Sequence, residues 1–124
     1  MKIPFKAFTS KIGLSPGSLV FVGKKKLEKV QISVIDYNKT KIQEKSVKNV
    51  KDCFPFKNSK SVSWINIDGL HDVNVIKSVG DHYKIHPLVL EDILHTNQRP
   101  KVEVFDNYVF LVVRMLSFNK QKTT

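Results

Sequence analysis

Two adjacent carboxylates are the side chains in this sequence best suited to chemistry. Glu91 and Asp92 lie in the segment HPLVLEDILHTNQRP, His86–Pro100, and His95 follows Asp92 by three residues. Hard cations such as Mg²⁺ prefer carboxylate oxygens, usually one or two with several retained waters. A carboxylate near an imidazole could instead bind a transition metal, although a histidine near a helix end also complements the helix dipole. The pattern indicates either a divalent-cation site or an acidic pair that is simply solvated.

The same segment carries the start and stop signals of a short helix. Pro87 can begin a helix because its missing N–H would be unsatisfied there anyway, and Pro100 disfavours helical geometry at Arg99. At about 100° per residue, one arc of this helix is apolar and the opposite arc carries the acids. The apolar arc is Val89, Leu90, Ile93 and Leu94, and the opposite arc is Leu88, Glu91, Asp92 and His95. We therefore expect a helix that packs on a core and presents both carboxylates outward.

The composition is that of a globular domain with a strong positive charge. The chain has 124 residues, of which 41% are hydrophobic and 26% charged, with a net charge of +10, and this length suits one domain with a core. Such a charge favours nucleic acid or an anionic lipid surface as a partner. The lysines are dispersed without interleaved aromatic residues, and no DNA- or RNA-binding motif occurs. We expect a solvated lysine-rich surface and no nucleic-acid partner, with a basic nucleic-acid-binding α/β domain as the alternative.

Several other functional classes lack support in the sequence. Cys53 is the single cysteine, in the apolar stretch CFPF, so we expect a buried small hydrophobe rather than a disulfide or a nucleophile. No nucleophile elbow, P-loop, HExxH or Rossmann glycine pattern occurs, so we expect no enzyme, although His86, Glu91, Asp92 and His95 would be its acid-base groups. No run approaches the ~18–20 apolar residues of a membrane helix, and no signal peptide opens the chain. We expect a soluble, cytosolic chain.

The rest of the chain alternates strand and helix patterns around the acidic helix. Ser15-Pro16-Gly17 predicts a turn, Asp72 predicts a helix cap, and Asp106-Asn107 predicts a hairpin turn. Trp64 and Asn66 are expected to serve core packing and local hydrogen bonding. Apolar alternation predicts strands over 19–22, 30–37, 41–47, 62–68, 102–105 and 108–118, and helices over 47–54, from 73 onward and over 87–95. This order predicts an α/β fold, a mixed β-sheet with helices packed on it.

The strand pattern near the end of the chain bears on the domain boundaries. Residues 108–113 are apolar on both faces, which predicts a central strand, yet only residues 119–124 follow the predicted strand over 108–118. We therefore expect a basic N-terminal arm over 1–12, an α/β domain over 13–118 that is truncated on its C-terminal side, and a tail over 119–124.

Four segments give the chain a family resemblance. Their order and spacing resemble those in the cytoplasmic domain of the CorA magnesium transporters. They are GLSPGSLVFVG (Gly13–Gly23), VSWINIDGLHD (Val62–Asp72), IHPLVLEDIL (Ile85–Leu94) and QRPKVEVFDNYVFLVVRM (Gln98–Met115). The resemblance implies a cytoplasmic α/β/α domain of a homopentameric channel for magnesium that also passes cobalt and nickel. It also implies two C-terminal membrane helices with a Gly-Met-Asn signature, which this chain lacks, so we expect a non-conducting piece.

The resemblance also assigns a role to the acidic pair. In the family, two acids in this helix face a neighbouring subunit and form regulatory divalent-cation sites with acids from later helices. The matching positions are Glu91 and Asp92, and the partner acids would lie outside this chain. The expected function is divalent-cation sensing at the cytoplasmic side of a membrane, with Mg²⁺ as the ion and Co²⁺ or Ni²⁺ as further candidates. The expected partners are other subunits, with membrane contact only through the missing helices. A related zinc transporter remains an alternative.

Overall fold

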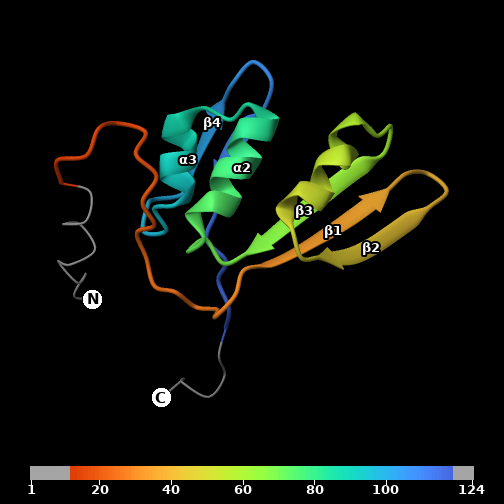
Figure 1. The fold of residues 1–124 in the computed structure, drawn as a ribbon, viewed down its shortest axis with the longest axis horizontal. Coiled ribbons are helices and arrows are strands. Elements are labelled where there is room, and N and C mark those ends of the chain that lie inside the picture. Colours follow the sequence, from red (N-terminus) through yellow and green to blue (C-terminus); the bar gives the residue numbers. More distant parts are fainter. Residues whose placement is uncertain (1–11, 119–124) are drawn as a thin grey trace.

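The computed structural model describes residues 12–118, which form an α/β arrangement (Figure 1). The expected α/β class is confirmed, while the expected arm over 1–12, except for Ile12, and the expected tail over 119–124 lie outside the described residues. The elements in order are β1 (Gln31–Tyr37), β2 (Ile42–Val47), the 3₁₀ helix η1 (Val50–Asn58), β3 (Val62–Asp68), α2 (Val73–Tyr83), α3 (Pro87–Ile93), β4 (Lys101–Val104) and β5 (Val109–Val112).

The first three strands form an antiparallel sheet in the order β2-β1-β3. Val34 in β1 lies opposite Lys45 in β2 and Ile65 in β3. The predicted alternation over 30–37 is confirmed because Ile32 and Val34 are buried on one face. A tight turn follows β1, in which Asn38 Oδ1 accepts hydrogen bonds from the backbone N–H groups of Thr40 and Lys41, both at 2.9 Å. The asparagine side chain therefore pairs with the backbone N–H groups of the turn and helps to set the register of the hairpin between β1 and β2.

The buried side chains form two clusters that share Ile67 as a packing neighbour. The first cluster contains Ile32, Val34, Val50 and Cys53, and the second contains Ile76, Leu90 and Leu94. Cys53 is fully buried, as predicted. Figure 1 shows α2 and α3 side by side at one end of the molecule and the three-stranded sheet at the other.

Helix α2 begins and ends with local signals that its sequence carries. Asp72 caps the first turn and accepts a hydrogen bond from the Asn74 N–H at 3.1 Å, as predicted. The helix ends at Lys84, whose φ of 60° places it in the left-handed region. Gly80 is buried against α3, and a Cβ there would overlap Leu90, with Leu90 Cγ only 3.0 Å away. This glycine therefore permits the close packing of α2 on α3.

Three predicted elements differ from the structure. The strand predicted over 108–118 covers only β5, Val109–Val112. The predicted strand over 19–22 is wrong except at Val22, which forms an isolated parallel bridge with His95. The predicted helix over 47–54 is instead a 3₁₀ helix over Val50–Asn58 that includes Pro55. The start of η1 is set by Asn49, whose side chain accepts a hydrogen bond from the Lys51 N–H at 3.0 Å. The cap moves the helix three residues later than its apolar pattern suggests.

Two further predictions about burial are wrong. Trp64 is not part of the core: it is 65% exposed on the face of β3 opposite the buried side chains. The predicted central strand near the chain end is β5, which within residues 12–118 pairs with β4 alone. Val109 and Leu111 are 60% and 57% exposed, so apolar content on both faces did not produce a central position. The expected local hydrogen bond of Asn66 is present, from Nδ2 to Asp68 Oδ2 at 2.9 Å.

No helix within residues 12–118 combines the length and the apolar character needed to cross a membrane.

Candidate metal site on helix α3

Helix α3 is built as its sequence predicts. Pro87 occupies its first turn, and His86 Nδ1 accepts a hydrogen bond from the Leu88 N–H at 3.1 Å. This bond satisfies one of the backbone donors that a helix start leaves unpaired. The predicted apolar arc is confirmed, because Val89, Leu90 and Leu94 are buried and Ile93 packs against the second cluster. The opposite arc therefore holds Glu91 and Asp92 at the surface.

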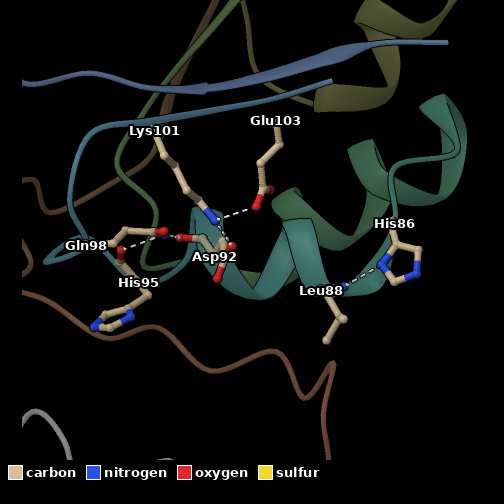
Figure 2. Close-up of polar contacts among 7 residues, drawn as sticks. All are labelled: His86, Leu88, Asp92, His95, Gln98, Lys101 and Glu103. Carbon is tan, nitrogen blue, oxygen red and sulfur yellow. Dashed lines mark hydrogen bonds and ion pairs between the residues drawn. The ribbon is translucent and has the colours of Figure 1, made fainter. Parts of the chain in front are cut away.

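Asp92 lies in an ion pair within its own chain. Lys101 Nζ is 2.6 Å from Asp92 Oδ2 and 3.2 Å from Glu103 Oε1, and Figure 2 shows the ammonium group between the two carboxylates. The hydrogen bond to Asp92 raises the pKa of Lys101 above its ordinary value, with a smaller contribution from Glu103. Lys101 and Glu103 are alternate residues of β4, so both side chains lie on the same face of that strand. This face is the one turned toward α3.

Glu91 contacts a different part of the chain. Its Oε2 accepts a hydrogen bond from the Gly17 N–H at 2.8 Å. Gly17 has a φ of +83° in the turn that Ser15 and Pro16 begin, and the Ser18 N–H donates to the Ser15 carbonyl at 3.1 Å. The predicted turn is therefore confirmed. Glu91 attaches the N-terminal segment to α3 through a charge-assisted hydrogen bond.

The carboxylates of this region surround an open hollow of about 620 Å³. Glu91 and Asp92 line it from α3, Glu103 and Phe105 from the β4 side, and Pro16 from the N-terminal segment. The opening has room for a hydrated hard cation, which keeps several waters when it binds and needs only one or two carboxylate ligands. Lys101 now neutralises part of this charge.

The histidines of this region make other contacts: His86 lines the same hollow as the carboxylates, and its Nδ1 accepts the hydrogen bond that caps α3. His95 contacts Asp92 and Gln98 through its backbone. Its backbone N–H donates to the Asp92 carbonyl at 3.0 Å, and its backbone carbonyl accepts a hydrogen bond from Gln98 Nε2 at 3.2 Å (Figure 2). The His82 ring stacks on Phe54 at 4.0 Å between centroids. Within residues 12–118, no group of three or more His, Cys, Asp or Glu side chains is placed to hold a metal ion. The donor chemistry of Glu91 and Asp92 fits Mg²⁺, but these residues supply only part of a coordination shell.

Sequence reasoning missed three residues that complete the surroundings of the acidic pair. Gly17 contacts Glu91 and Lys101 contacts Asp92, while Glu103 is linked to Asp92 through Lys101. The alternation of Lys101, Val102 and Glu103 on a strand signals that the lysine and the glutamate share a face. The direction of that face depends on how β4 packs, which the local pattern does not contain.

The fold and this site define an α/β domain with a carboxylate-bearing surface helix. Residues 59–124 match the sequence model of the family described as CorA-like Mg²⁺ transporter protein. The chain belongs to this family, which confirms the resemblance. It is 45% identical over 115 residues to the "Cobalt/magnesium transport protein CorA" of Thermotoga maritima, an alignment that covers 93% of this chain and 32% of the relative. The chain therefore spans about a third of the length of that relative.

Proposed function

We propose that this chain belongs to the cytoplasmic, divalent-cation-sensing domain of a homopentameric magnesium and cobalt transporter. On this proposal the 124-residue chain neither conducts ions by itself nor acts as an enzyme. Family membership supports the proposal, as does the printed name of the Thermotoga maritima relative. The observation that carries it is the position of Glu91 and Asp92 on the half-buried arc of α3, opposite the buried Val89, Leu90 and Leu94.

The two acids are suited to a metal site that is completed by another subunit rather than to a complete site within one chain. Glu91 and Asp92 are adjacent on a helix, so their carboxylates diverge and do not both chelate one small ion tightly. Each can reach a hydrated Mg²⁺ directly or through its waters. On this proposal, acids of a neighbouring subunit supply the remaining ligands. Co²⁺ and Ni²⁺ are further candidates for the same site.

Lys101 gives this site a competing cation. Its ammonium group contacts Asp92 at 2.6 Å and Glu103 at 3.2 Å, in the region that a metal ion would share. An ion pair at the protein surface contributes about 0.2–1 kcal/mol, so a divalent cation can displace it at a modest cost. The site would then be weak, which suits a sensor that responds to free Mg²⁺. In the isolated chain, without the neighbouring acids, we expect an affinity that is millimolar at best.

Occupancy of the site would act on the assembly through charge. Carboxylates on facing subunits repel each other until a divalent cation lies between them. A bound cation would therefore hold the subunits together and favour a closed channel, and its loss would let them separate. This coupling is reciprocal, because a conformation that favours binding is itself favoured by the bound ion. The result is feedback from the transported ion on its own entry.

Limited proteolysis of a transporter that carries this domain tests the proposal. Mg²⁺ should protect the wild-type protein from cleavage, and the double substitution Glu91→Ala and Asp92→Ala should remove that protection. The control is Asp81→Asn, which changes an exposed acid that is paired with Lys77 on α2 at 2.6 Å. Protection that persists in the double variant would exclude these two residues as the sensor.

A further inference from the structure

A second hollow lies away from the acidic face, between segments that are distant in the sequence. It has a volume of about 780 Å³, within the ~300–1,000 Å³ typical of small-molecule sites. Its walls come from residues 21 and 23–27 before β1, from 68–71 at the end of β3 and from 96–97 after α3. None of these residues belongs to the acidic site described above.

Backbone hydrogen bonds hold two of these walls together. The Val22 N–H donates to the Leu94 carbonyl at 2.8 Å, and the Thr96 N–H donates to the Val22 carbonyl at 3.0 Å. Thr96 Oγ1 also donates to the Val22 carbonyl at 3.0 Å. A Cβ at Gly23 would overlap Thr96 Oγ1. The glycine therefore lets the backbone at residue 23 lie closer to Thr96 than any residue with a side chain would. The 21–23 and 96–97 walls are therefore fixed relative to each other.

The third wall is positioned by a glycine at the end of β3. Gly69 has a φ of +96°, and a Cβ there would lie 3.2 Å from His71 Cε1. The left-handed conformation turns the chain immediately after Asp68, which brings Leu70 and His71 to the hollow. Gln31 at the start of β1 lies opposite Asp68 in the sheet register and completes this side.

The lining combines positive charge with apolar surface. Lys24, Lys25 and Lys26 all line the hollow, against the single carboxylate of Asp68. Asp68 accepts a hydrogen bond from Asn66 at 2.9 Å, and Lys25 Nζ is 3.6 Å from Glu28 in an exposed ion pair. The apolar part of the lining is Phe21, Leu27 and Leu70. Lysine ammonium groups bind phosphates as point charges, and aromatic and aliphatic walls bury the apolar part of a ligand.

We propose that this hollow binds a phosphorylated small molecule of nucleotide size. The phosphate groups would contact Lys24, Lys25 and Lys26, and the base would lie against Phe21 and Leu70. The volume, the excess of lysine over carboxylate and the apolar wall together favour this ligand over a bare anion. The inference does not depend on the proposed cation-sensing function, because the two sites share no residue.

Calorimetric titration of the 124-residue chain tests the inference, with ADP, pyrophosphate and adenosine as probes at about 0.15 M ionic strength. We expect ADP to bind at least about fivefold more tightly than pyrophosphate, because only ADP also uses the apolar wall. The triple variant Lys24→Gln, Lys25→Gln and Lys26→Gln should weaken ADP binding at least about tenfold. The matched triple variant Lys39→Gln, Lys41→Gln and Lys60→Gln, which removes the same charge from exposed positions, should change it less than about twofold.

Three results would overturn the inference. The first is an equal loss of ADP affinity in both triple variants, which would indicate attraction by net charge alone. The second is an equal affinity for ADP and pyrophosphate, which would exclude a role for Phe21 and Leu70. The third is the absence of ADP binding to the wild-type chain. Thermal unfolding of each variant confirms folding, and Asn97→Asp, which adds a carboxylate to the lining, provides an independent variant that should also weaken ADP binding.

Discussion

Lys101 is the residue whose removal should most directly change the acidic site. It bridges Asp92 and Glu103, so Lys101→Gln would leave both carboxylates without this ammonium group. A lost surface ion pair of up to ~1 kcal/mol corresponds to a gain in Mg²⁺ affinity of up to about fivefold. The measurement is a Mg²⁺ titration that follows the amide signals of α3. The control is Lys77→Gln, which breaks the Lys77–Asp81 pair on α2. An affinity that is unchanged or reduced in Lys101→Gln would show that Lys101 does not compete with the metal.

Asp36 makes the stability of the β-sheet depend on pH. Hydrogen bonds from Ser63 at 2.6 Å and from Ser61 at 2.7 Å hold the pKa of Asp36 below its ordinary value of 3.8, although partial desolvation opposes them. The unfolded chain therefore binds this proton more readily than the folded chain. The resulting stabilisation is present above about pH 4 and is lost as the pH falls toward the lower pKa of the folded state.

Ser63→Ala should therefore flatten part of the pH dependence of stability. The variant should lower the free energy of unfolding above about pH 4 more than below it, because only the ionised carboxylate uses the bond fully. Urea denaturation over roughly pH 2.5–6 measures this difference. Ser46→Ala, on the exposed face of β2, serves as the control. A parallel shift at every pH would contradict the role assigned to Asp36.

Cys53 should report the opening of the first core cluster. Its side chain is fully excluded from solvent. This burial raises the pKa of the Cys53 thiol, and Asp52 makes a smaller contribution in the same direction. Since the thiolate is the reactive form, a thiol reagent should label the folded chain at least ~100-fold more slowly than the chain in denaturant. Because Cys53 is the single cysteine, the denatured chain is its own control. Rapid labelling without denaturant would contradict the packing around η1.

At the scale of the elements, the contact between α2 and α3 depends on Gly80. Alanine would gain about 1 kcal/mol of helix propensity, but its Cβ would overlap Leu90, a side chain that is only 4% exposed. Overpacking of this kind costs about 1–3 kcal/mol, so Gly80→Ala should lower the free energy of unfolding. Chemical denaturation measures the change, with Asn74→Ala at an exposed position of α2 as the control. A stabilised Gly80→Ala variant would show that α3 moves away at little cost.

Elements with signals in their own residues were predicted well, and the others were not. Asp72, Pro87 and the turn residue Asn38 each make the local contact that their type implies, so β1, α2 and α3 match their predicted positions. The strand over 19–22 failed because Val22 alone finds a partner, the backbone beside His95. The alternation of apolar residues within 19–22 does not show whether a distant part of the chain is available to pair with it.

At the scale of the whole molecule, the surroundings of the acidic pair could be predicted only in part. The helical period placed Glu91 and Asp92 on the arc opposite the buried side chains, because it depends on neighbouring residues alone. The contacts to Gly17 and Lys101 depend on how the N-terminal turn and β4 pack against α3, and no local pattern contains that information. Trp64 failed for the same reason, since alternation defines two faces of β3 without saying which one is covered.

The central claim is that Glu91 and Asp92 hold a divalent cation, and Mn²⁺ tests it most directly. Mn²⁺ is a paramagnetic substitute with the oxygen preference of Mg²⁺, so it broadens amide signals near its site even when binding is weak. At substoichiometric Mn²⁺, broadening in the 124-residue chain should centre on residues 88–95 and should disappear in the variant Glu91→Gln, Asp92→Asn. Broadening that centres elsewhere, or that persists unchanged in this variant, would contradict the claim.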